Sequence, residues 1–404
     1  MLIRRSAVLP AVMLLLGLAP PLTGESRAGT SGWASQMTQD LLAAQRISDG
    51  SSVKIALLTD GVASGVRSLK DALEKEKDLV GTPRPERRSG TLMASLIVGG
   101  APVGSSVGIR GLAPAARILP IRVYAAAYEP GGRTWQETAH WGTILANGVR
   151  YAVDHGADVI AVDAYATGPE TAELRAAITY AQTKKVVVVA AINVQKPDDP
   201  PAYPVSAPGV IGVGTVAKDG RRDGKSTSRS SSIIVSAPGT TVPSIGPDNR
   251  PWTFWGTPVA LTFTTAAVAM VRSKYPQLTP AQVGQALSAS ARRPKGKGRY
   301  DTDLGFGYLN PVGALDEAHR LTEQTAPAMT AKSSVPDKAR LGDRPGTIRA
   351  VPYDAPVIGG FGGLALAGLV ALGFAVRLAL RKRPVPHPAP AEPADTTEPD
   401  TATS

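Results

Sequence analysis

The 404-residue chain lacks cysteine altogether and has only four histidines. Without thiols it can form no disulfide, so an exported chain must keep its fold without covalent cross-links. No cluster of residues has metal-ligand spacing, so we expect no metal site and no cofactor, and a structural calcium site would leave no recognisable signal. Aromatic residues are sparse at 5%, and no basic motif carries base-stacking residues, which argues against nucleic-acid binding.

Long hydrophobic runs near the two ends of the chain predict export and anchoring. Arg4 and Arg5 precede the apolar stretch 7–18, the pattern of a secretory signal peptide within residues 1–28. Residues 357–380 are predicted to form one transmembrane helix, because the first twenty carry no charge and can span the hydrocarbon core. Basic residues follow that charge-free stretch directly: Arg377, Arg381, Lys382 and Arg383.

These basic residues determine the expected orientation. By the positive-inside rule, the tail of residues 381–404 lies in the cytoplasm and the globular part faces outward from the cell membrane. The tail mixes Pro, Ala, Glu, Asp and Thr and is expected to be disordered, whereas residues 323–356 are expected to form a stalk. The net charge of +11 would favour anionic lipid headgroups or cell-wall polymers as neighbours.

Residues 30–322 remain for one globular domain, which is long enough to bury a large core. Short apolar runs alternate there with Ala-rich helical stretches. This alternation predicts an α/β fold with a mostly parallel central sheet flanked by helices. The apolar stretch 259–271 is suited to a buried central helix.

Six segments of this domain occur in an order that resembles the subtilisin-like serine peptidases. One of them closes a strand on Thr-Asp-Gly where that family has Asp-Thr-Gly. The segments are Val53–Val62, Ser89–Ile97, Gly108–Val123, Val186–Asn193, Gly209–Val216 and Gly305–Asn310. The resemblance implies a subtilisin-like three-layer fold. The signal peptide, stalk and single anchor add a resemblance to the membrane-anchored mycosins of actinobacterial type VII secretion.

The chemistry of that family needs a Ser nucleophile, a His base and an Asp that orients the imidazole. The positions that resemble these three hold Pro258, Ser89 and Thr59, in that order. A hydroxyl does not titrate near neutral pH and cannot replace the His base. Proline has neither a nucleophilic atom nor the N–H that helps to bind the oxyanion. We therefore expect no functional catalytic residue at the triad positions.

Each replacement has an ordinary structural interpretation. Because side chains alternate along a strand, Asp60 is expected to point away from position 89 and to act as a turn residue before Gly61, unless a bulge restores it. Ser89 is expected to cap a helix with its side-chain oxygen. Pro258 suits the first turn of a helix, where a missing N–H costs nothing.

The rest of the expected cleft also departs from the family. Asn193 is at the position of the oxyanion-binding Asn, but without a nucleophile we interpret it as a residue that closes a strand. Asp163 and Tyr165 replace the Ser and Gly of the substrate-binding segment, and the Tyr165 ring is expected to obstruct the substrate. The histidines fall at no motif position: His140, His155, His319 and His387.

Two functional hypotheses follow. The first is a catalytically degenerate, membrane-anchored pseudopeptidase that acts as an extracytoplasmic scaffold, with secretion-apparatus components or an active paralogue as protein partners. The alternative is an active serine endopeptidase with a non-standard constellation of Asp60 and an unrecognised hydroxyl and base. Peptide capture without cleavage lies between them and is disfavoured by Tyr165.

Overall fold

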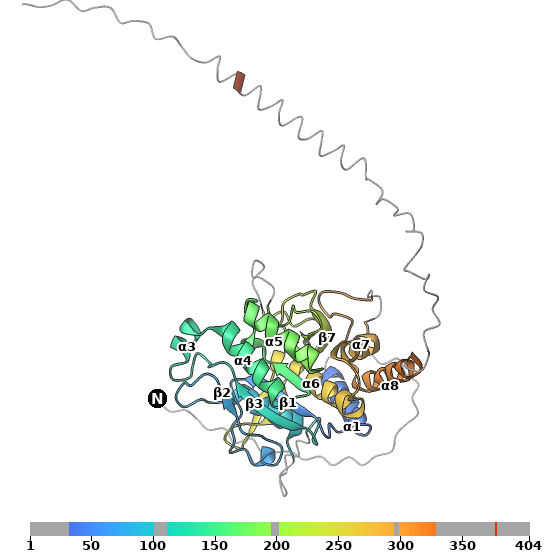
Figure 1. Ribbon diagram of the computed structural model, residues 1–404, viewed down its shortest axis with the longest axis horizontal. Helices are drawn as coiled ribbons and strands as arrows, with labels where there is room; N and C mark the ends of the chain where they lie inside the picture. The colour runs from blue at the N-terminus through green and yellow to red at the C-terminus, as the bar shows by residue number, and fades with distance from the viewer. Residues whose placement is uncertain (1–31, 101–110, 195–201, 295–298, 329–375, 378–404) are drawn as a thin grey trace, which may run out of the picture. The chain divides into compact units, whose positions relative to one another are not determined.

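The computed structural model describes residues 32–100, 111–194, 202–294, 299–328 and 376–377, and its named helices and strands lie in the compact unit 1–331. A parallel sheet of the order β2-β3-β1-β4-β5-β6-β7 forms the middle layer of this unit (Figure 1). The strands are β1 (Lys54–Thr59), β2 (Lys77–Asp78), β3 (Arg117–Arg122), β4 (Val159–Val162), β5 (Val187–Ala191), β6 (Ile211–Val216) and β7 (Ile233–Pro238). The predicted α/β fold with a parallel central sheet is confirmed.

Helices cover both faces of the sheet. One face packs against α4 (Trp141–Asp154) and α5 (Ala172–Thr183). The other packs against α1 (Gly32–Gln45), α2 (Arg88–Val98), α6 (Thr257–Lys274), α7 (Pro280–Ser290) and α8 (Pro311–Ala328). The shorter elements are α3 (Gly132–Thr138), η1 (Arg67–Leu69), η2 (Ala164–Ala166) and the hairpin of β8 (Val242–Ile245) and β9 (Pro251–Phe254).

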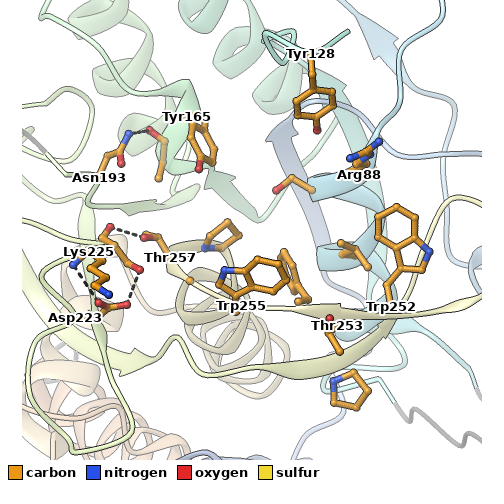
Figure 2. Close-up of a pocket in the computed structure, with 18 of the residues that line it drawn as sticks. Arg88, Tyr128, Tyr165, Asn193, Asp223, Lys225, Trp252, Thr253, Trp255 and Thr257 are labelled. Carbon is orange, nitrogen blue, oxygen red and sulfur yellow. Dashed lines mark hydrogen bonds between the residues drawn. The ribbon is translucent and has the colours of Figure 1, made fainter. Parts of the chain in front are cut away.

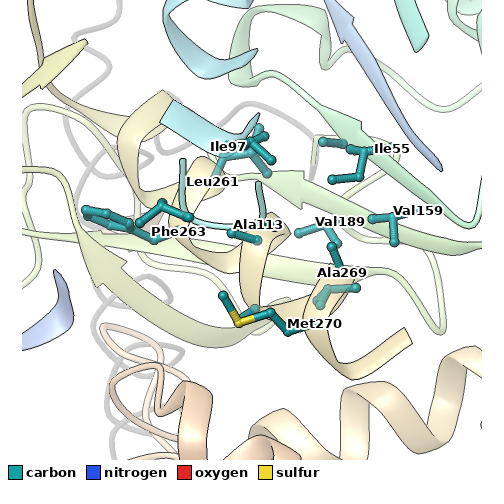
Figure 3. Close-up of a cluster of buried hydrophobic side chains, with 14 of the residues drawn as sticks. Ile55, Ile97, Ala113, Val159, Val189, Leu261, Phe263, Ala269 and Met270 are labelled. Carbon is teal, nitrogen blue, oxygen red and sulfur yellow. The ribbon is translucent and has the colours of Figure 1, made fainter. Parts of the chain in front are cut away.

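The central strands are apolar on both faces because both faces are covered. In β1, Ile55 and Leu57 belong to the core under α6, whereas Ala56 and Leu58 belong to the core under α4 and α5. Figure 3 shows the α6 side of this core, where side chains of the sheet meet those of the central helix. The strand periodicity thus divides one apolar run between two cores.

Helix α6 is the buried central helix that the sequence predicts. It begins at Thr257, directly after Gly256, whose φ of 88° is a conformation that favours glycine. Pro258 lies in its first turn, where no intrahelical bond is lost, so the structural interpretation of this proline is confirmed. The starts of α6 and α2 lie beside the carboxyl ends of β1, β4 and β5, the edge at which open α/β sheets bind ligands.

Among the residues that the structure describes, no helix has the length and apolar character needed to cross a membrane. The predicted transmembrane helix 357–380 lies outside those residues apart from Val376 and Arg377. The predicted signal peptide and tail, and most of the predicted stalk, also lie outside them.

Candidate functional site

A cleft of about 1150 Å³ opens at the carboxyl edge of the sheet. Its walls come from the start of α2, the turn η2, the loop 223–226, the β8–β9 hairpin and the start of α6 (Figure 2). The positions that resemble the family's catalytic His and Ser, Ser89 and Pro258, both line this cleft. Two of the three triad positions named from the sequence thus lie together at one cleft.

The start of α6 offers no nucleophile. Pro258 presents a pyrrolidine ring to the cleft and has no N–H for an oxyanion. The neighbouring hydroxyl, Thr257 Oγ1, donates a hydrogen bond to the carbonyl of Ser226 at 2.6 Å. That bond connects the loop 223–226 to the helix start, so the Thr257 hydroxyl has a structural partner.

Asp60 caps helix α2, contrary to the sequence-based expectation. Its Oδ2 accepts the N–H of Ser89 at 3.0 Å and its Oδ1 accepts the N–H of Gly90 at 2.8 Å. The prediction that Asp60 points away from position 89 is wrong, because β1 ends at Thr59 and side-chain alternation ends with it. The carboxylate instead satisfies two first-turn N–H groups of the helix.

Ser89 is consequently not the helix cap that was expected. Its Oγ donates a hydrogen bond to Oδ2 of Asp163 at 2.8 Å, and the hydroxyl of Tyr124 donates to the same oxygen, also at 2.8 Å. Asp163 is fully buried, so it lies beneath the cleft and not in its wall. We call Asp60, Ser89, Tyr124 and Asp163 the buried acid cluster.

The cluster holds two carboxyl groups whose pKa values are raised. Burial raises the pKa of Asp60 to about 7, with a further contribution from the negative charges of Asp163 and Glu129, while the N–H groups of Ser89 and Gly90 oppose the shift. Burial also raises the pKa of Asp163, against the hydrogen bonds from Tyr124 and Ser89. The pKa of the Tyr124 hydroxyl lies well above its ordinary value for the same reason, so this group stays a hydrogen-bond donor.

No imidazole reaches the cluster among the described histidines. His155 ends α4, where its ring stacks on Tyr151 at 3.7 Å and contacts the Tyr151 carbonyl. His319 is exposed on α8, where its Nε2 lies 3.4 Å from Glu323 Oε1. His140 precedes α4 and does not line the cleft, and His387 lies outside the described residues.

The segment that resembles the family's substrate-binding strand forms the turn η2 in this structure. Residues 164–166 form η2, and the Ala166 N–H donates to the Asp163 carbonyl at 2.9 Å. The Ala164 carbonyl accepts both Thr167 Oγ1 at 2.8 Å and Asn193 Nδ2 at 3.4 Å. The Asp163 and Ala164 carbonyls are therefore engaged within the chain, which disfavours their pairing with an extended substrate strand.

Asn193 and Tyr165 both border the cleft. The Asn193 amide is held from both sides, since its Oδ1 also accepts the Val194 N–H at 2.7 Å. Its bonds are those of a residue that ends a strand. The Tyr165 ring is exposed and forms part of the wall, and the cleft stays open beside it (Figure 2).

Sequence reasoning missed two groups of the site. Tyr124 directly follows the Gly108–Val123 segment, so its place beyond the carboxyl end of β3 was a usable signal. Of the three exposed aromatic rings, the sequence placed Tyr165 in the cleft, but it missed Tyr128 and Trp255, which come from separate segments.

Comparison with known proteins agrees with this geometry. A family model described as the subtilase family matches residues 50–308. Mycosin-1 of Mycolicibacterium smegmatis is 27% identical over 409 residues, which cover 90% of this chain and 88% of that protein. The crystal structure of MycP1 from the ESX-1 type VII secretion system has a TM-score of 0.59 at 27% identity and covers 70% of this chain and 85% of that one.

A third similarity concerns the fold alone. The structure of the periplasmic assembly from the ESX-5 inner membrane complex has a TM-score of 0.58 at 23% identity, covering 82% of this chain and 91% of that one. The family model, by contrast, matches well over half of the present sequence. The chain therefore belongs to the subtilase family and is similar to its mycosin members.

Proposed function

We propose that this chain is a catalytically degenerate, membrane-anchored subtilase that acts as an extracytoplasmic interaction module of a type VII secretion apparatus. The observation that carries the proposal is Pro258 in the first turn of α6, at the position of the attacking serine. The helix begins where the family's helix begins, but proline supplies neither a nucleophile nor an N–H for the oxyanion.

The other two triad positions support the same conclusion. Thr59 Oγ1 accepts the N–H of Gly61 at 3.1 Å, a bond within the turn that follows β1. Ser89 supplies a hydroxyl in place of an imidazole. Since loss of one triad member in such an enzyme costs several orders of magnitude in rate, loss of all three leaves no efficient route to an acyl-enzyme.

A role with secretion components is proposed from similarity. The related MycP1 structure is described as coming from the ESX-1 type VII secretion system, and the fold recurs in the periplasmic assembly of the ESX-5 inner membrane complex. A domain that keeps this fold without its chemistry retains a rigid surface for docking. The predicted signal peptide and anchor would hold that surface outside the membrane, where such components assemble.

The alternative function, an active peptidase of non-standard constellation, rests on one contact. Ser89 Oγ donates to Asp163, whose raised pKa would suit a general base. Two observations oppose it. Tyr124 donates to the same carboxylate oxygen, and Asp60 already accepts the N–H groups of Ser89 and Gly90 that would stabilise an oxyanion beside this hydroxyl.

We expect the full chain in membranes to show neither covalent labelling by a fluorophosphonate probe nor cleavage of unfolded casein, under conditions in which a subtilisin is labelled and active. Crosslinking in the native membrane is expected to recover secretion-apparatus components. Labelling that disappears in a Ser89→Ala variant but persists in Thr257→Val would establish the alternative. Crosslinks to lipid or to the chain alone would contradict the scaffold role.

Restoring the triad is expected to give no turnover. A variant with Thr59→Asp, Ser89→His and Pro258→Ser regains the three side chains but keeps η2, whose carbonyls are engaged internally. It also adds a carboxylate next to the buried Asp60, which disfavours ionisation of both. Casein cleavage by this variant at a rate within about tenfold of a subtilisin would show that the cleft still accepts a peptide.

A further inference from the structure

Three aromatic rings are unusually exposed at the cleft. Tyr128, Tyr165 and Trp255 are 58%, 61% and 64% exposed, and no other large hydrophobic side chain in the described part of the chain reaches these values. All three line the cleft, from three different segments (Figure 2). Exposed apolar surface gathered in one concave site indicates a binding function.

The neighbouring side chains stabilise this aromatic lining. The Arg88 guanidinium lies 4.7 Å from the centre of the Tyr128 ring and 5.7 Å from that of Trp252, so one cation contacts both rings. On the other side, the Tyr165 ring contacts the buried Tyr124 ring, with 6.0 Å between centres. Tyr128 and Tyr165 thus have packed neighbours and offer a ligand preformed faces.

The remaining lining is mixed, with apolar surface from prolines, Trp252 and Phe254 beside polar groups. Asn193, Ser226 and Thr253 present amide and hydroxyl groups, and Leu92 is the one branched aliphatic side chain among the described lining residues. Flat aromatic faces interspersed with hydroxyl and amide groups match a sugar ring, which has an apolar C–H face and polar edges.

The cleft lining also contains one ammonium group, that of Lys225, and one carboxylate, that of Asp223. Lys225 is exposed, and its ammonium group forms no ion pair within the part of the chain that the structure describes. The nearby Asp223 is engaged within its own turn, where its Oδ1 accepts the Lys225 N–H at 3.1 Å and its Oδ2 accepts the Ser226 hydroxyl at 2.6 Å. The overall charge of +11 has the same sign. Because the Asp223 oxygens are directed into their own turn, the Lys225 ammonium is available to pair with a carboxylate of a ligand.

We infer that the cleft binds an anionic oligosaccharide, with sugar rings stacked on Trp255 and Tyr165 and a carboxylate directed to Lys225. The inference rests on the proposed loss of peptidase function, because the engaged carbonyls of Asp163 and Ala164 disfavour the pairing of a substrate strand there. Cell-wall polymers are glycans of this kind, and an anchored protein whose domain faces outward would have access to them.

The test is calorimetric titration of the detergent-solubilised full chain with a tetramer of alternating N-acetylglucosamine and N-acetylmuramic acid, which carries carboxylates. Chitotetraose is the uncharged control and a proline-rich peptide is the competing ligand. Saturable binding of the muramic tetramer is expected, weakened about tenfold by Trp255→Ala or by Tyr165→Ala. Lys225→Gln should reduce the affinity for this tetramer to that for chitotetraose. Tyr180→Ala on α5, outside the cleft, should change nothing.

Several results would overturn the inference: no saturable binding, unchanged affinity in the Trp255→Ala variant, equal affinity for chitotetraose in the wild type, or binding of the peptide in place of the glycan. A separate casein assay on the same sample distinguishes the two proposals. Cleavage would remove the proposed function, whereas the titration alone decides the glycan site.

Discussion

Replacing Arg122 with alanine is expected to lower the free energy of unfolding by about 3–5 kcal/mol. The Arg122 guanidinium is fully buried at the end of β3, where it donates to Glu129 Oε2 at 2.9 Å and to Asp78 Oδ2 at 3.1 Å. The Glu129 side chain is buried as well. Alanine would therefore leave a carboxylate in the interior without its cation. Urea unfolding measures the loss as a lower midpoint at an unchanged slope.

An exposed ion pair provides the control. Arg175 Nε and Glu170 Oε1 lie 2.6 Å apart with side chains 63% and 45% exposed, so Arg175→Ala is expected to change the stability far less than Arg122→Ala. A double variant with Arg122→Met and Glu129→Gln removes both buried charges and should recover part of the loss. If Arg122→Ala were no more costly than Arg175→Ala, the buried pair would not be what stabilises this region.

The Arg122 pair also matters for the site. Glu129 uses its second oxygen, Oε1, to accept the Glu86 N–H at 2.9 Å, just before helix α2 begins. The same glutamate follows Tyr128, whose ring lines the cleft. A buried charge network thus connects the end of β3 to two walls of the cleft, and we expect Arg122→Ala to loosen the Tyr128 wall as well as the fold.

The sequence predicted those features that depend on local physical chemistry. Runs such as Ile55–Leu58 must be covered on both sides, which gives a parallel sheet between helices. The helix start at Pro258 follows from a fixed φ and a missing N–H. Both are properties of a few consecutive residues, so they can be recognised without knowledge of the tertiary contacts.

The buried acid cluster could not be predicted in this way, because its contacts join distant parts of the chain. Ser89 and Tyr124 lie 74 and 39 residues from Asp163, the acceptor they share. Strand alternation also gave the wrong direction for Asp60, since the rule holds only within the strand and β1 ends one residue earlier. The turn η2 has no distinctive pattern either, as its sequence suits an extended strand equally well.

The protein is expected to be more stable at pH 5 than at pH 8, and Asp60 is expected to cause much of the difference. Its pKa is about 7 in the folded protein and about 4 in the unfolded chain, so the folded state binds a proton more tightly. A raised carboxyl pKa contributes stability at low pH, and this contribution is lost as the pH rises from about 4 to about 7. For Asp60 alone the loss between pH 5 and pH 8 is about 2–3 kcal/mol.

Asp60→Asn separates this effect from other titrations. Asparagine resembles the neutral carboxyl group and can still accept one of the two N–H groups at the start of α2, so its stability should change much less between pH 5 and pH 8. The raised pKa of Asp163 acts in the same direction, so the free energy of unfolding of Asp60→Asn should still fall somewhat between pH 5 and pH 8. The exposed Asp71→Asn variant should show the same difference in stability between pH 5 and pH 8 as the wild type. Urea unfolding at the two pH values measures each difference in stability. If the wild type and Asp60→Asn showed the same difference, the buried carboxyl would not take up a proton on folding.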